Sequence, residues 1–324
     1  MMRQIAMTAT GGPETLFLRD VPIPSPGPGE ILIRQTAAGL NFIDVYHRTG
    51  LYPVTLPTGL GLEGAGIVEA VGEGVTRFHI GDRAAFCSGP LGAYADFACV
   101  PQNKAVRVPE AIELDVAAAI MLKGLTAEFL VRRLVHLGAG DSVLFHAAAG
   151  GVGLIACAWL AKLGVTVIGT VGSPAKAELA KAHGCTHTIL YRDEPIAARV
   201  RELTDGKGCR AVFDSVGADT IIASLDSAAR RGLVVSFGNA SGPPAPFAAS
   251  ELARRGSLMF TRPTLFDFVG TVEELDMAAA ALFEVVTSGS VRPVIGARFA
   301  LEDAAQAHRD LEARKTMGST IFVM

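Results

Sequence analysis

Hydrophobic positions are spaced differently in successive parts of the chain, and this spacing predicts which elements form. In the first hundred residues, short apolar runs are separated by glycine and proline, a pattern typical of β-strands joined by turns. Four prolines alternate between Pro22 and Pro28, and this segment cannot be helical because proline lacks the backbone N–H. We therefore expect a β-rich region with strands at Ile31–Arg34, Gly66–Val71, Arg83–Phe86 and Phe97–Val100.

From about Leu114 the chain becomes alanine-rich and helical, and a regular alternation of apolar strands and helices follows. Such an alternation favours a parallel, doubly wound α/β sheet, in which ligands bind at the carboxyl ends of the strands. Strands are expected at Ser142–His146, Thr166–Thr170, His187–Leu190, Ala211–Asp214, Leu233–Phe237 and Leu258–Phe260. Helices are expected between them, at Val152–Leu163, Ala175–Ala182, Ile196–Leu203 and Thr220–Ala229.

The last part of the chain leaves this alternation. Val272–Ser288 and Leu301–Ala313 have helical spacing, with short strands at Ala297–Phe299 and Thr320–Val323. We infer that this tail returns to complete the N-terminal β-rich domain. The predicted domains are therefore residues 1–124 with 264–324, and a doubly wound domain over residues 125–263.

One uncharged stretch, Ser142–Ala161, is long enough on paper to cross a bilayer. Its pattern changes midway, however, from a buried strand to apolar residues at helical spacing. His146 and three glycines lie at the change. A buried strand, turn and helix explain the segment better than a membrane span.

Composition and charge narrow the range of functions. The chain has 36 glycines in 324 residues, where roughly 7% would give about 23, and glycine is favoured where backbone turns sharply or approaches a ligand. The net charge of −3, without a basic block, disfavours nucleic acid and anionic membranes as main partners. Five scattered cysteines and the lack of an apolar N-terminal segment predict reduced thiols and a cytoplasmic location.

The strongest motif lies between the first strand and the first helix of the doubly wound domain. The segment His146–Gly153 replaces the dinucleotide fingerprint G-x-G-x-x-G with Ala148-x-Gly150-x-x-Gly153. Gly150 would let the backbone approach a pyrophosphate at the helix N-terminus, and Gly153 would let helix and strand pack tightly. The alternative is a glycine-rich packing turn without a ligand.

The end of the second strand indicates which dinucleotide binds. NAD-binding domains place an acidic residue there, but Gly169–Ser173 contains none, and Lys176 follows. A hydroxyl and a cation suit a 2′-phosphate, and Tyr191 after the third strand could stack on or hydrogen-bond to the same end. The predicted cofactor is NADPH. The alternative is that Lys176 is a solvated lysine of the first helical turn.

Sequence blocks along almost the whole chain closely resemble one family. They are Gly11–Glu14, Asn41–Tyr46, Gly50–Pro53, Leu122–Thr126, Leu144–Cys157, Gly169–Gly172, Asp214–Gly217 and Val235–Asn239. In this order they resemble the NADPH:quinone oxidoreductases, the zeta-crystallin-like, zinc-free branch of the medium-chain dehydrogenase/reductase superfamily. The resemblance implies a GroES-like catalytic domain built from both chain ends, with a Rossmann domain inserted between them.

The resemblance also implies which residues bind the cofactor. The catalytic domain would contribute Phe42, Ile43, Tyr46 and Arg314. The nucleotide domain would contribute Thr126, Gly150, Gly151, Val152, Gly172, Ser173, Lys176 and Tyr191, with Ser215, Phe237, Gly238 and Asn239 at the nicotinamide half. Phe129 stands where relatives often have tyrosine. Relatives pair as homodimers through a strand that corresponds to residues 257–261, and we expect the same here.

Zinc is not expected. The related alcohol dehydrogenases hold zinc through a cysteine near the start of the segment Asn41–Asp44 and a Gly-His-Glu triplet. This chain has no cysteine near Asn41, and its triplet is Gly61-Leu62-Glu63. Only Cys87 and Cys99 lie where those relatives carry a four-cysteine lobe.

Without a Lewis acid the substrate must itself accept a hydride readily, and a quinone does. Asn41 and Tyr52 are the candidates for holding a quinone oxygen or the carboxamide; the alternative is a structural role, in loop hydrogen bonding or partial burial. Lys123 and His146 are interpreted as helix-end and strand-end residues. Reduction of activated alkenes such as enones, or a non-catalytic crystallin-like role in nucleotide binding, are the alternative functions.

Overall fold

The computed structural model describes residues 1–324, which divide into two compact units. Unit 1 comprises Met1–Leu125, Val269–Thr287 and Pro293–Met324, and unit 2 comprises Thr126–Phe268 and Ser288–Arg292. The second boundary therefore lies five residues beyond the predicted one, and a short segment of the tail belongs to unit 2. Both chain ends lie in unit 1.

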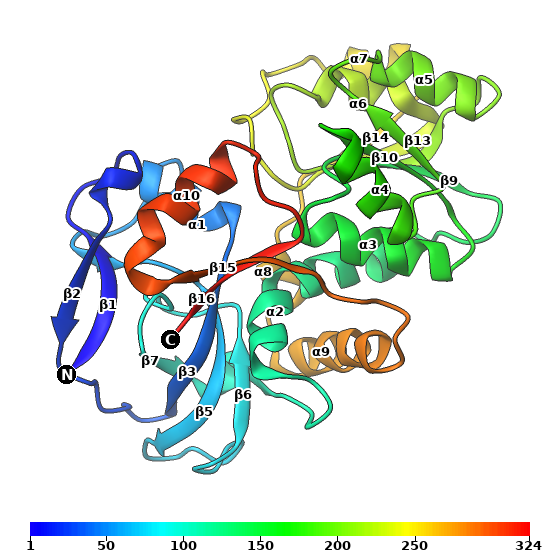
Figure 1. Ribbon diagram of the computed structural model, residues 1–324. Coiled ribbons are helices and arrows are strands. Elements are labelled where there is room, and N and C mark those ends of the chain that lie inside the picture. Colours follow the sequence, from blue (N-terminus) through cyan, green and yellow to red (C-terminus); the bar gives the residue numbers. More distant parts are fainter. The chain divides into compact units, whose positions relative to one another are not determined.

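Unit 1 is built on two sheets (Figure 1). The tail strand β16 (Ser319–Val323) pairs antiparallel with β3 (Glu30–Leu40), with Thr320 opposite Leu40, so the expected return of the chain is confirmed. The larger sheet has the order β15 (Ile295–Ala300), β16, β3, β5 (Glu63–Val71), β6 (Arg83–Phe86) and β8 (Ala105–Arg107), and β7 (Phe97–Pro101) also pairs with β3. The smaller sheet has the order β2 (Phe17–Val21), β1 (Met2–Met7) and β4 (Thr58–Gly59).

The helices of unit 1 come from three parts of the chain. They are α1 (Phe42–Thr49), α2 (Leu114–Glu128, which continues into unit 2), α9 (Val272–Thr287) and α10 (Ala304–Glu312). The predicted helix at Leu301–Ala313 begins as a 3₁₀ turn, Leu301–Asp303, before α10. The N-terminal helix α1 was not among the predicted elements.

Unit 2 is a single parallel sheet with helices, and the predicted α/β class is confirmed (Figure 1). The strand order is β11 (His187–Leu190), β10 (Thr166–Val171), β9 (Ser142–Phe145), β12 (Cys209–Asp214), β13 (Ala228–Ser236) and β14 (Met259–Thr261). The helices are α3 (Gly151–Lys162), α4 (Pro174–Ala182), α5 (Ile196–Leu203), α6 (Ile221–Ser227), α7 (Ser250–Arg254) and α8 (Leu265–Phe268).

The core of unit 2 explains why its strands were predictable. Leu144, Ile168, Ile189, Val212 and Val234 come from five neighbouring strands and lie buried in one cluster. Strands that are covered on both faces consist of nearly continuous apolar runs, which the sequence makes visible. The predicted boundaries are wrong where α6 meets β13: α6 ends at Ser227 rather than Ala229, and β13 runs over Ala228–Ser236 rather than Leu233–Phe237.

The uncharged stretch Ser142–Ala161 is confirmed as strand, turn and helix, consisting of β9 and the larger part of α3. No helix of the chain has both the length and the apolar character that a membrane span requires.

Candidate functional site

The turn between β9 and α3 has the geometry of a dinucleotide turn. Gly150 is the N-cap of α3, and its N–H donates to the carbonyl of Ala147 at 2.9 Å. A Cβ on Gly150 would meet only the Ala147 oxygen, at 3.2 Å, so this side of the turn is otherwise open. Ala147 takes the left-handed conformation (φ 54°), whereas Ala148, at the first position of the fingerprint, does not. Alanine is therefore tolerated at that position.

Gly153 is where the helix packs most closely. A Cβ there would fall 2.5 Å from the Ala147 oxygen and 2.6 Å from the Ala148 oxygen. The tight packing expected of Gly153 is present, but it is against the turn itself rather than against the strand.

The end of β10 offers polar groups without a carboxylate. Ser173 caps α4, and its Oγ accepts the N–H of Lys176 at 3.4 Å. The first turn of α4 has no acidic residue. A Cβ on Gly172 would lie 2.8 Å from the hydroxyl of Tyr191, which follows the neighbouring strand β11. The structure thus brings Gly172, Ser173, Lys176 and Tyr191 to one corner of the sheet.

The loops after β12 and β13 lie against each other. Ala240 N–H donates to the Ser215 carbonyl at 3.2 Å, and a Cβ on Gly238 would fall 2.6 Å from the same oxygen. The ring of Phe237 packs 5.9 Å from that of Phe145, at the end of β9. Ser215 and Phe237–Asn239 therefore share the carboxyl edge of the sheet with the dinucleotide turn.

In unit 1, the predicted residues gather on and beside α1. Asn41 is its N-cap, and its backbone N–H donates to Asp44 Oδ2 at 2.8 Å in a capping box. The ring of Tyr46 lies 6.3 Å from Phe42 and 5.2 Å from Tyr52. Tyr52 N–H also donates to the Tyr46 carbonyl at 3.0 Å. The structure therefore brings Asn41, Phe42, Ile43, Tyr46 and Tyr52 together.

The amide of Asn41 is engaged in a buried ionic cluster. Its Nδ2 donates to Glu63 Oε2 at 2.8 Å, and Lys123 Nζ lies 3.0 Å from the same oxygen. Glu63 Oε1 accepts the N–H of Leu122 at 2.7 Å. Glu63 is fully buried and Lys123 nearly so. Pairing with Lys123 and these hydrogen bonds compensate the burial of the Glu63 charge.

This cluster corrects one interpretation and adds a residue. Lys123 lies inside α2 and ion-pairs with Glu63, so it is not a helix-end residue. His146 does follow directly after β9, as expected. The sequence pointed to Glu63 only as part of the triplet Gly61-Leu62-Glu63, because its burial and its ion pair with Lys123 appear only in the fold.

Asp44 connects α1 to a second group of buried polar side chains. Tyr94 donates its hydroxyl to Asp44 Oδ2 at 2.7 Å, and His308 Nε2 lies 3.4 Å from that hydroxyl. Burial raises the pKa of Asp44 to about 7, although the hydrogen bonds from Tyr94 and Asn41 oppose the rise. Burial, with the nearby Arg48 charge, lowers the pKa of His308 to about 3.

Four predicted residues remain: Gly151 and Val152 are the first two residues of α3, whereas Thr126 and Arg314 lie near the ends of α2 and α10. Thr126 is a buried residue of α2 and the first residue of unit 2. Arg314 follows α10 in unit 1, with φ 57°, and its N–H donates to the Leu311 carbonyl at 3.0 Å.

Comparisons with known proteins agree with this geometry. Residues 27–110 match the alcohol dehydrogenase GroES-like domain, and residues 151–283 match the zinc-binding dehydrogenase family. A quinone oxidoreductase of Pseudomonas aeruginosa is 53% identical over the full length of both chains. The chain belongs to the quinone oxidoreductase family of the medium-chain dehydrogenases/reductases.

Two further members of the superfamily bear on the site. The structure of Escherichia coli quinone oxidoreductase in complex with NADPH has a TM-score of 0.97 and 44% identity, and covers 99% of this chain and 100% of that one. A 2-haloacrylate reductase of a Burkholderia species is 42% identical over 97% of this chain and 96% of that one.

Zinc ligands of the dehydrogenase type are replaced in this quinone oxidoreductase family member. No group of three or more His, Cys, Asp or Glu side chains in residues 1–324 is placed to hold a metal ion. No cysteine lies near Asn41, and Leu62, which is buried, stands where the Gly-His-Glu triplet of the dehydrogenases has histidine. All five cysteines have free thiols.

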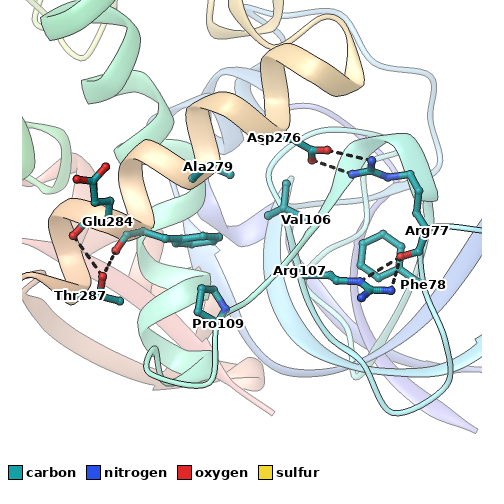
Figure 2. A pocket seen from close by; sticks show the side chains of 11 residues that line it. Arg77, Phe78, Val106, Arg107, Pro109, Asp276, Ala279, Glu284 and Thr287 are labelled. Atoms are coloured by element: carbon teal, nitrogen blue, oxygen red, sulfur yellow. Dashed lines mark hydrogen bonds and ion pairs between the residues drawn. The ribbon is translucent and has the colours of Figure 1, made fainter.

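A separate hollow of about 580 Å³ lies in unit 1, between α9, β8 and the segment at Arg77 and Phe78 (Figure 2). Both arginines that line it have partners: Arg77 donates to both carboxylate oxygens of Asp276, at 2.8 and 3.0 Å, and Arg107 donates to the Arg77 carbonyl. None of the predicted site residues lines it.

Proposed function

We propose that this chain is an NADPH:quinone oxidoreductase that transfers a hydride from the nicotinamide to a quinone without zinc. The observation that carries the proposal is the carboxyl edge of the unit 2 sheet. At this edge, the open glycine turn at the start of α3 lies near the carboxyl end of β10. Ser173 and Lys176 follow β10, and no carboxylate is present there. The NADPH-bound E. coli relative supports the same cofactor here.

The chain's residues fit this cofactor. The open side of Gly150 and the N-terminus of α3 would accept the pyrophosphate, because unpaired N–H groups and the helix dipole favour an anion. Gly172, Ser173, Lys176 and Tyr191 would hold the 2′-phosphate end. The rest of the proposed set comprises Thr126, Gly151, Val152, Ser215, Phe237, Gly238 and Asn239 of unit 2, and Phe42, Ile43, Tyr46 and Arg314 of unit 1.

Bound NADPH supplies the hydride, so the protein's task is orientation and the exclusion of water. We assign Asn41 to fixing the start of α1, because its amide is held by Glu63. Tyr52, whose ring packs on Tyr46, is the proposed donor to the quinone oxygen, since a phenol both donates and accepts hydrogen bonds.

A second candidate function is the reduction of activated alkenes. The 42% identity to a 2-haloacrylate reductase favours it, since the two proteins align over almost their full lengths. Hydride addition to an alkene conjugated with a carbonyl or carboxylate requires the same cofactor placement, but the proton is delivered to carbon rather than to oxygen.

We also propose a homodimer and a cytoplasmic location. β14 is the edge strand of the unit 2 sheet and lies within residues 257–261, where the dimer contact is expected, and Met259 in it is 49% exposed. An unpaired edge offers backbone groups to a second copy of the chain. Five free thiols suit a reducing compartment.

The test is NADPH oxidation measured side by side with 1,4-naphthoquinone, an enone and 2-chloroacrylate. Higher kcat/KM with the quinone supports the proposal, and higher kcat/KM with an alkene favours the second candidate. NADPH binding without turnover of any substrate would favour a non-catalytic, crystallin-like role.

A further inference from the structure

A line of buried polar side chains lies beneath the dinucleotide turn, wholly within unit 2. His146, Thr170, Asp214 and Ser224 are each at most 2% exposed. They come from the ends of β9, β10 and β12 and from α6. Buried polar groups are retained when they are hydrogen-bonded, so the direction of each bond can be worked out.

The carboxylate end fixes the first direction. Asp214 accepts hydrogen bonds throughout its surroundings, and Ser224 Oγ, 2.6 Å from Asp214 Oδ2, donates its one hydroxyl proton there. The contact of 3.0 Å between Ser224 Oγ and His146 Nε2 then requires the imidazole to donate. His146 therefore carries its proton on Nε2.

The direction of the hydrogen bond at the other ring nitrogen, Nδ1, follows from the assignment of the proton to Nε2. Burial lowers the pKa of His146, although the Asp214 charge opposes this, so the ring is neutral and Nδ1 is an acceptor. Thr170 Oγ1, 3.1 Å away, donates to it. Thr170 Oγ1 in turn accepts the N–H of Ala147 at 3.3 Å. All bonds in the line consequently point the same way, from Ala147 to Asp214.

The two ends of this line are the two segments proposed to bind the dinucleotide. Ala147 opens the turn before α3 and holds a left-handed conformation that alanine rarely adopts. At the other end, Asp214 Oδ1 accepts the N–H groups of Val216 and Gly217 at 2.8 and 3.0 Å, directly after Ser215. Thr220 Oγ1 also donates to Asp214 Oδ1, at 2.8 Å.

We infer that His146 is a positioning residue: as its neutral Nε2–H tautomer it connects the turn 147–150 to the loop 215–217 and holds both in the arrangement that receives NADPH. This inference rests on the proposed function, because it takes these two segments as the cofactor site. The structure assigns His146 no contact with the substrate or reacting atoms.

Isothermal titration calorimetry of NADPH binding to variants of His146 tests the positioning role. His146→Leu removes the acceptor for the Thr170 hydroxyl and the donor to Ser224 Oγ, so the line is broken in the middle, and it should raise the NADPH Kd at least about tenfold. His146→Gln keeps one donor and one acceptor and should recover part of this loss. His183→Leu, a half-buried histidine at the end of α4, is the matched control and should leave the Kd within about twofold of wild type.

A spectroscopic test is independent of any activity. ¹⁵N NMR of histidine-labelled protein at pH 7 should show His146 with a bare Nδ1 and a protonated Nε2, its resonance being identified by its loss in His146→Gln. An Nδ1–H tautomer would overturn the inference, as would a folded His146→Leu variant that binds NADPH like wild type. If His146→Leu does not fold, Ser224→Ala breaks the same line, and a Kd unchanged in it overturns the inference. Wild-type protein that shows the tautomer but binds no NADPH would contradict the proposed function instead.

Discussion

At the scale of single residues, Gly153 is confined more tightly than its place in a helix requires. The Cβ of an alanine would lie 2.5–2.7 Å from backbone atoms of Ala147 and Ala148, which cannot move without shifting the turn. We expect Gly153→Ala to destabilise the protein by about 1–3 kcal/mol and to weaken NADPH binding. Gly138→Ala is the control, because nothing lies within 4 Å of its Cβ. Thermal unfolding of the two variants measures this difference, and Gly153→Ala should have the lower midpoint. Equal midpoints would contradict the close approach of Gly153 to Ala147 and Ala148.

Lys176 is the residue that should select the cofactor. Replacing it with alanine removes the cation proposed for the 2′-phosphate while keeping the Ser173 cap, so the KM for NADPH should rise about tenfold or more and the KM for NADH should change little. Lys181→Ala on the same helix, where Lys181 pairs with Glu178 at 3.1 Å, is the control. An unchanged NADPH/NADH preference in Lys176→Ala would refute the assignment.

Residue types and their order were predictable at this scale, but their partners were not. The missing acid after β10 is visible in the sequence, because it depends on local position. The bond from Asn41 to Glu63 spans 22 positions and also involves Lys123, 60 positions from Glu63. Such pairing depends on how strands and helices meet, which local patterns do not encode.

At the scale of elements, α1 depends on a buried carboxyl. The pKa of Asp44 is about 7 in the fold against 3.8 for the unperturbed group, so the unfolded state ionises first as pH rises. The free energy of unfolding should therefore fall between about pH 4 and pH 7, by up to about 4 kcal/mol from this group. Asp44→Asn keeps an acceptor for Tyr94 and Asn41 but cannot ionise.

Urea unfolding from pH 4 to pH 8 measures this effect. Subtracting the Asp44→Asn profile from that of wild type should give a difference that declines across the window, whereas Asp20→Asn, at an exposed position on β2, should follow wild type. Parallel profiles for wild type and Asp44→Asn would mean that Asp44 is not the responsible group.

Element prediction succeeded where burial is complete and weakened where it is partial. The apolar runs of β9, β10 and β12 and the helical spacing of α3 gave boundaries close to those observed. Helix α1 was missed, although Asn41-x-x-Asp44 has the spacing of a capping box. The helix spans only eight residues, and two of its four buried side chains, Asp44 and Arg48, are charged. The helical repeat of apolar residues is therefore too short to recognise in the sequence.

At the scale of the whole molecule, we expect two copies to associate through β14. Met259→Lys places a charge on the exposed edge and should shift light scattering from a dimer toward the 33.8 kDa monomer. Met277→Lys is a matched control, because Met277 on α9 is 51% exposed against 49% for Met259. A wild-type monomer at micromolar concentration would rule out the dimer.

The order of the chain through its two units was predictable, but the strand registers were not. The tail's return to unit 1 followed from the end of the strand–helix alternation. The pairing of Thr320 with Leu40, however, joins positions almost a chain length apart. Register is set by which side chains face the core, and this becomes defined only when the strands meet.

The central claim is metal-independent, NADPH-specific quinone reduction. Its most direct test is the ratio of kcat/KM for NADPH to that for NADH, measured with 1,4-naphthoquinone in a strong chelator. We predict full activity in the chelator and a preference for NADPH of about tenfold or more. A preference for NADH, no quinone-dependent oxidation, or activity lost to the chelator and restored by zinc would contradict the account.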